Sequence, residues 1–200
     1  MQNNSIQSSL GQTDIYLIDQ IMKGRYTAND IILDAGCGGG RNLHWFVQQH
    51  FNITGIDISD PTIQELKAKY PALPENSLLV SSLESMPFPD DHFNHIICSA
   101  VLHFAKSTAQ FNCMLTEIAR VVKPGGTLFI RMTSDIGIEE KVTLIADGVY
   151  RIPDGSTRFL LTRPLLAACM QQNKLSFAEP LKTTNVNDMR CMSTLLLQKN

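Results

Sequence analysis

Residues 31–46 read IILDAGCGGGRNLHWF. This stretch contains an apolar run, a turn with four glycines and a helix that we expect to begin near Arg41. Glycines allow a sharp turn and a close approach of the backbone to a ligand, and free N–H groups at a helix start favour a negatively charged group. A strand, a glycine-rich turn and a helix in this order therefore indicate a nucleotide-binding fold.

Further apolar runs alternate with segments that can form helices, and these runs lie at residues 53–56, 78–80, 96–98 and 128–130. Strands that alternate with helices pair in parallel, and strands that are apolar throughout are covered by helices on both faces. Two last runs, at 176–184 and 189–198, are close enough to predict an antiparallel hairpin. We therefore expect an α/β fold, a Rossmann-like three-layer α/β/α sandwich with a seven-stranded, mostly parallel sheet and an antiparallel C-terminal hairpin strand.

Helices are predicted near residues 13–23, 107–122 and 163–172 from the spacing of their apolar residues. Residues 1–12 are polar and are expected to form a flexible tail before a single domain at 13–200. Residues 133–161 contain charged and turn-forming residues with only a weak helical pattern. We interpret this segment as an irregular insertion that follows the fifth strand.

Composition excludes several classes of protein. Hydrophobic residues make up 44% and charged residues 18%, as in folded globular proteins. The net charge of −2 and the lack of a basic run argue against nucleic acid as the main partner. The five cysteines form no C-x-x-C pair, so we expect neither disulfides nor a metal site. The N-terminal residues do not resemble a secretory signal and no stretch is long enough to span a bilayer, so we expect a cytoplasmic protein without membrane contact.

The glycine turn and two acidic residues suggest which nucleoside binds. Asp57 ends the second apolar run, where a carboxylate can accept hydrogen bonds from both hydroxyls of a ribose. Arg41 stands where the dinucleotide fingerprint needs its third glycine, which argues against NAD. Asp34 would repel a pyrophosphate and would attract an ammonium group. S-adenosylmethionine has an ammonium group and no phosphate.

These motifs resemble those of the class I S-adenosylmethionine-dependent methyltransferases. Residues 34–40 resemble the family's D-x-G-x-G-x-G cofactor loop, and residues 83–88, 93–99 and 121–128 resemble its adenine-side segment, its fourth strand and the turn into its fifth. The chain departs from the family at Ser81 and Ser82, where an Asp often contacts adenine. The resemblance implies a methyltransferase with S-adenosylmethionine as cofactor and S-adenosylhomocysteine as product. The cofactor-binding residues that it implies are Asp34, Gly36, Cys37, Gly38, Gly40, Asn42, Asp57, Ile58, Ser82, Leu83 and Cys98.

The methyl acceptor is less well indicated. The [Asn/Asp/Ser]-Pro-Pro-[Tyr/Phe] motif of amino-directed methyltransferases is absent after the fourth strand, which favours a small-molecule acceptor. His103 is a candidate general base, although the sequence favours a positioning or merely polar histidine over this role. Tyr150, Arg151 and Arg158 are candidate acceptor contacts if residues 133–161 cover the acceptor site. A non-catalytic S-adenosylmethionine- or nucleoside-binding protein remains the alternative, and both a monomer and a homodimer remain open.

Overall fold

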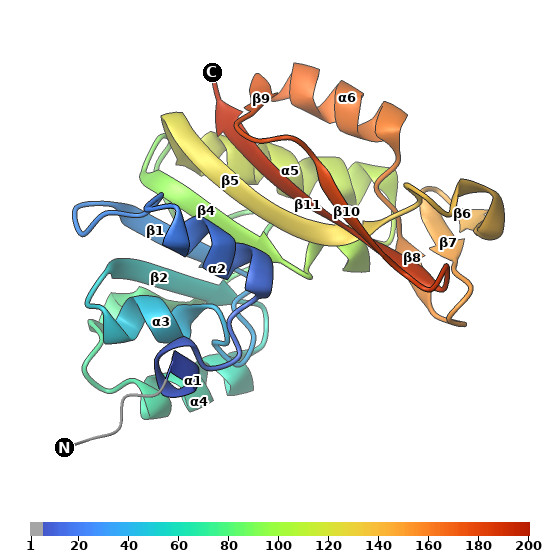
Figure 1. Ribbon diagram of the computed structural model, residues 1–200. Coiled ribbons are helices and arrows are strands. Elements are labelled where there is room, and N and C mark those ends of the chain that lie inside the picture. Colours follow the sequence, from blue (N-terminus) through green and yellow to red (C-terminus); the bar gives the residue numbers. More distant parts are fainter. Residues whose placement is uncertain (1–5) are drawn as a thin grey trace.

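The computed structural model describes residues 6–200 as a central mixed sheet with helices on both faces (Figure 1). The strand order is β10-β11-β5-β4-β1-β2-β3, and a short strand, β9, also pairs with β11. Strands β1 to β5 pair with one another in parallel, whereas β11 is antiparallel to β5, β9 and β10. The bounds are β1 Ile31–Ala35, β2 Asn52–Asp57, β3 Leu78–Val80, β4 Phe93–Ser99, β5 Val122–Ser134, β9 Leu175–Phe177, β10 Lys182–Val186 and β11 Arg190–Lys199.

Several helices begin after residues whose side chains cap them. Ser59, Ser107 and Thr162 each accept a hydrogen bond from a backbone N–H in the first turn of the helix that follows. Helices α5 and α6 lie on one face of the sheet, and α2, α3 and α4 lie on the other (Figure 1). The helix bounds are α1 Ile6–Leu10, α2 Ile15–Met22, α3 Leu43–Gln48, α4 Asp60–Lys69, α5 Thr108–Val121 and α6 Arg163–Gln172, with single 3-10 turns η1 Glu75–Ser77, η2 Leu102–Phe104 and η3 Glu139–Lys141.

Each face of the sheet has its own apolar core. On one face Phe111 and Ile118 of α5 pack with Leu166 of α6, and on the other Leu17 of α2 packs with Phe46 of α3. The strands between them are buried on both sides, as their continuous apolar runs predict. The expected three-layer sandwich is confirmed, and so is the antiparallel C-terminal hairpin. The run at 176–184 is interrupted, because Pro180 separates β9 from β10.

Two expectations differ from the structure. Residues 6–10, which we expected in a flexible tail, form α1, and the carbonyl of Ser8 lies 3.0 Å from Nε2 of His44. Residues 1–5 lie outside the described residues. Residues 133–161 are not irregular, because β6 Thr143–Ala146, β7 Val149–Arg151 and β8 Thr157–Phe159 form a separate antiparallel sheet. This small sheet lies beyond the carboxyl end of β5 (Figure 1).

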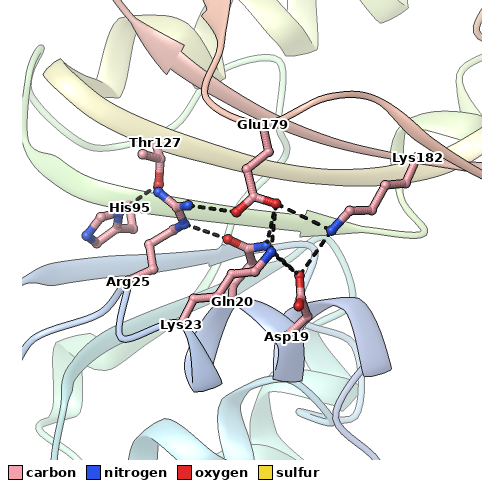
Figure 2. Close-up of polar contacts among 8 residues, drawn as sticks. All are labelled: Asp19, Gln20, Lys23, Arg25, His95, Thr127, Glu179 and Lys182. Atoms are coloured by element: carbon pink, nitrogen blue, oxygen red, sulfur yellow. Dashed lines mark hydrogen bonds and ion pairs between the residues drawn. The ribbon is translucent and has the colours of Figure 1, made fainter.

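A network of charged side chains joins α2 to the segment between β9 and β10 (Figure 2). Glu179 accepts hydrogen bonds from Lys23 at 2.9 Å, from Arg25 at 3.0 Å and from Lys182 at 3.3 Å. Asp19 pairs with the same two lysines at 2.7 and 3.1 Å. The network therefore links α2 to β10, the strand at one edge of the sheet.

Within residues 6–200 no helix has the length and apolar character needed to cross a membrane.

Candidate functional site

A cavity of about 490 Å³ opens where the parallel strands β1, β2, β3 and β4 end. Ligands bind at the carboxyl ends of parallel strands in open α/β sheets, and small-molecule sites have about 300 to 1,000 Å³. Both position and size therefore fit a ligand site. The cavity is lined by Gly36, Gly38, Asp57, Ile58, Ser82, Leu83, Glu84, Ala100, Val101, Phe104, Gln110 and Met114.

The glycine turn is held against the end of β2. The N–H groups of Gly36 and Cys37 both donate to the carbonyl of Ile56, at 2.9 and 2.8 Å. The N–H of Gly38 donates to Oδ2 of Asp57 at 2.9 Å, and the N–H of Ser59 donates to Oδ1 at 2.9 Å. These bonds bring the turn and the Asp57 carboxylate to one wall of the cavity.

A side chain at Gly36 or at Gly38 would disturb the site in different ways. Gly36 has φ +79°, and an added Cβ would lie 2.5 Å from Cγ2 of Val101. Gly38 has φ +48°, and an added Cβ would have no atom within 4 Å. Gly36 therefore allows the loop after β4 to approach, whereas Gly38 leaves space open at the cavity wall.

Asp34 is buried at the end of β1. It is 1% exposed, and its Oδ2 has no hydrogen-bond partner among the described residues. Burial raises the pKa of its carboxyl to about 7; the charge of Arg41 lowers it and that of Asp57 raises it further. A buried carboxylate without a partner is costly, so a cation that reaches the neighbouring cavity would stabilise the charged form of Asp34.

The residues predicted to bind the cofactor divide into two groups. Gly36, Gly38, Asp57, Ile58, Ser82 and Leu83 line the cavity. The other five, Asp34, Cys37, Gly40, Asn42 and Cys98, do not line it and are at most 5% exposed where their exposure is given.

Three of these five residues, Cys37, Gly40 and Asn42, make contacts within the protein. Sγ of Cys37 would lie 3.1 Å from an added Cβ on Gly55, and an added Cβ on Gly40 would lie 2.7 Å from Leu66. Oδ1 of Asn42 accepts a hydrogen bond from the N–H of Asp14. The direct contact of all five with a ligand stays a prediction.

Half of the residues that line the cavity are not among the predicted cofactor-binding residues, namely Glu84, Ala100, Val101, Phe104, Gln110 and Met114. Gln110 and Met114 are four residues apart on α5, and Nε2 of Gln110 donates to Oε1 of Glu84 at 2.7 Å. Ala100 has φ +65°, a rare value for a residue with a Cβ that often marks functional sites. The spacing of Gln110 and Met114 predicts from the sequence that they lie on the same face of a helix. It does not predict that this face lines the cavity.

A polar cluster lies beside the cavity, around the carboxylate of Asp14. Oδ2 of Asp14 accepts hydrogen bonds from Arg131 at 3.2 Å and from Oγ of Ser99 at 3.3 Å, and lies 3.5 Å from Arg41. The Asp14 side chain is only 3% exposed. Asp14 thus fixes both guanidiniums at the carboxyl ends of β4 and β5, next to Ala100.

A second cavity of about 340 Å³ lies between η2 and the small sheet. Phe104 lines both cavities, so the two cavities are adjacent. Arg158 also lines this second cavity, and its guanidinium carbon lies 5.2 Å from the centre of the Phe104 ring. Tyr150 and Arg151, the other two predicted acceptor contacts, line neither cavity, and their contact with an acceptor stays a prediction.

His103 lines the second cavity and is 7% exposed. Burial lowers its pKa to about 4, helped by the charges of Arg158, Arg190 and Arg131. The backbone N–H of Thr133 donates a hydrogen bond to Nδ1 of His103 over 3.4 Å. The neutral ring therefore carries its proton on Nε2, and its one acceptor nitrogen, Nδ1, is already occupied by this hydrogen bond. This arrangement suits a positioning residue better than a general base.

Among residues 6–200 no group of three His, Cys, Asp or Glu side chains could hold a metal ion.

Sequence comparisons agree with the motifs. A family model described as a methyltransferase domain matches residues 33–130. The chain is 33% identical over 122 residues to an uncharacterized methyltransferase of Bacillus subtilis, YodH, over 60% of this chain and 47% of that protein. It is also 33% identical over 103 residues to a tRNA (carboxymethyluridine(34)-5-O)-methyltransferase of Arabidopsis thaliana, over 52% of this chain and 24% of that protein. The chain spans less than half the length of these relatives.

Solved structures share the fold at low identity. A SAM-dependent methyltransferase from Methanosarcina mazei superposes with a TM-score of 0.67 at 19% identity, over 90% of this chain and 96% of that one. The 1,6-didemethyltoxoflavin-N1-methyltransferase of Burkholderia thailandensis, solved with 1,6-didemethyltoxoflavin and S-adenosylhomocysteine bound, has a TM-score of 0.66 at 16% identity, over 98% of this chain and 80% of that one. At these identities the likeness shows a common fold.

Proposed function

Because this chain belongs to the class I S-adenosylmethionine-dependent methyltransferases, we propose that it transfers the methyl group of S-adenosylmethionine to a small molecule. The observation that supports this most directly is the cavity wall formed by Gly38 and Asp57. A carboxylate beside a glycine turn at the end of the second strand is suited to the two hydroxyls of a ribose.

The residues present fit this cofactor. The Asp57 carboxylate lines the cavity and can accept further hydrogen bonds, and the open side of Gly38 leaves space for a ligand close to the backbone. The buried Oδ2 of Asp34 lacks a partner, and its charge would attract the ammonium group of the methionyl part. Ser82 and Leu83 line the same cavity and are suited to the adenine side.

S-adenosylmethionine, when bound, supplies a methyl group that is already activated on a sulfonium sulfur. The protein then mainly has to orient the acceptor and exclude water, because proximity alone lowers such a barrier greatly. Ala100 and Val101 line the cavity directly after β4, and Phe104 forms the wall towards the second cavity. These three residues would orient an acceptor from the side of the small sheet, without a dedicated base.

A small-molecule acceptor is supported by size and charge. Both cavities, at about 490 and 340 Å³, lie within the range of small-molecule sites. The chain has 17 Lys and Arg against 19 Asp and Glu, whereas nucleic-acid binding normally needs an excess of basic residues. One relative is a tRNA methyltransferase by name, so tRNA belongs in the experiment as a competing acceptor.

The test measures the formation of S-adenosylhomocysteine from S-adenosylmethionine. The protein is incubated with a small-metabolite extract, with a total tRNA fraction or with neither. We expect S-adenosylhomocysteine to form in the incubation with the metabolite extract and not in the other two. Product formation with tRNA alone would contradict the small-molecule acceptor. If S-adenosylhomocysteine binds but neither mixture gives product, the chain is the non-catalytic binding protein of the alternative interpretation.

A further inference from the structure

The second cavity is bounded by two parts of the chain that are distant in sequence. Its floor comes from the turn after β4 at residues 103–106, and its roof comes from the small sheet at residues 145–159. Because Phe104 lines both cavities, a molecule in the second cavity would lie next to the first. The position is that of an acceptor next to a cofactor, and to this extent the inference rests on the proposed function.

The walls of this second cavity are largely apolar. Ile145 is 51% exposed and Phe104 is 61% exposed, although both are large hydrophobic residues. Val149 and Phe159 of the small sheet contribute further apolar surface. Exposed apolar surface that lines a hollow marks a binding site for an apolar ligand.

Two cations line the cavity, Lys106 and Arg158. Among the described residues that line it, none is an Asp or Glu. Within residues 6–200 neither cation forms an ion pair with a carboxylate, and the only partner of the Arg158 side chain in a hydrogen bond is the carbonyl of Thr157, at 2.7 Å. The guanidinium stacks over the Phe104 ring, which holds it at the cavity edge.

Further arginines lie near this cavity. Arg131, Arg158 and Arg190 all act on the buried ring of His103, whose pKa is lowered first by burial and then by their charges. Arg131 is paired with Asp14 and Arg190 with Asp154, so the positive charge that remains for a ligand at the cavity comes from Lys106 and Arg158. An anionic group would neutralise this charge, and a guanidinium can bind a carboxylate through two parallel hydrogen bonds.

We propose that the cavity between η2 and the small sheet binds the methyl acceptor, and that this acceptor is an apolar molecule that carries a carboxylate. The carboxylate pairs with Arg158 and Lys106, and the apolar body lies against Phe104 and Ile145. The volume of about 340 Å³ fits a small molecule.

The experiment uses 2-naphthoate and its uncharged analogue 2-naphthamide as probes, titrated in a calorimeter into the protein saturated with S-adenosylhomocysteine. The preference for naphthoate is the ratio of the two dissociation constants. We expect at least about tenfold tighter binding of naphthoate, as for a charge-assisted pair. In Arg158→Gln and Lys106→Gln this preference should fall at least about threefold. Lys141→Gln, a matched loss of charge on η3 away from the cavity, should leave it unchanged.

Equal affinities for the two probes, or a preference that neither variant reduces, would overturn the proposal. Interligand nuclear Overhauser effects between naphthoate and S-adenosylhomocysteine are expected because the two cavities share Phe104. Their absence when both ligands are bound would overturn the assignment of this cavity to the acceptor. A separate titration with S-adenosylhomocysteine alone tests the proposed function. The two probes are also compared in the protein without S-adenosylhomocysteine, so a failure of cofactor binding is distinguished from a failure of the carboxylate preference.

Discussion

The backbone N–H of Gly38 donates a hydrogen bond to Oδ2 of Asp57 over 2.9 Å. The other carboxylate oxygen accepts from the N–H of Ser59, also over 2.9 Å. Each carboxylate oxygen can accept a second hydrogen bond. The carboxylate thus fixes the glycine turn to the end of β2 and still has acceptor sites for a ligand.

Asp57→Ala should weaken the binding of S-adenosylhomocysteine about tenfold to a hundredfold, because hydrogen bonds to a charged group contribute about 1.5 to 3 kcal/mol. The loss includes the support that Asp57 gives to Gly38. Calorimetric titration measures it. Asp60→Ala, at the start of α4 and outside the cavity lining, is the matched control and should bind normally. Unchanged affinity in a folded Asp57→Ala protein would remove this residue from the site.

Gly38→Val should abolish cofactor binding while most of the fold remains. The new side chain would occupy open space at the cavity wall and would need a φ of +48°, which β-branched residues avoid. Gly39→Val is the control, since Gly39 lacks positive φ and does not line the cavity. The measured quantity is the rise in Tm that S-adenosylhomocysteine gives each protein. An equal rise in both variants would show that Gly38 does not face the ligand.

The sequence predicts the central sheet well because its strands are buried on both faces. Runs such as Leu128 to Ile130 have no polar interruption, and only a strand covered by two helical layers needs such a run. The small sheet is less clearly marked. β6 contains the apolar residues Leu144, Ile145 and Ala146, but all its residues are exposed, so this short run does not follow from burial in the core. A further local signal is the Asp147-Gly148 turn with φ of +40° and +81°.

The candidate site is predictable only where local motifs define it. Gly38 and Asp57 follow from the turn and from the strand end, and both line the cavity. The burial of Asp34 depends on the strands on both sides of β1, which its own neighbours in sequence do not reveal. Phe104 and Met114 reach the cavity through the path of η2 and α5, a long-range property of the fold.

His103→Gln should change the pH dependence of stability. Burial lowers the pKa of His103 to about 4 in the folded protein, against about 6.5 when unfolded. The unfolded state therefore binds the proton first, and wild-type stability falls as the pH drops from about 6.5 to 4. By pH 5 this loss is about 1 to 2 kcal/mol, and it should be absent in the variant. Denaturant unfolding at pH 7.5 and pH 5 tests this, and parallel losses in both proteins would contradict it.

Glu179→Gln should destabilise the protein by about 1 to 2 kcal/mol at pH 7, because it weakens the pairs with Lys23, Arg25 and Lys182 in Figure 2. Burial raises the pKa of Glu179, but the hydrogen bonds from Lys23, Gln20 and Lys182 outweigh it and lower the pKa to about 2. The stabilisation is thus complete above the unfolded pKa, near 4.5, and is lost as the pH falls to about 2. Tm should drop by about 3 to 6 °C at pH 7 and by less at pH 3, whereas the exposed Glu65→Gln should change neither. An equal drop at both pH values would show that Glu179 acts through packing and not through its charge.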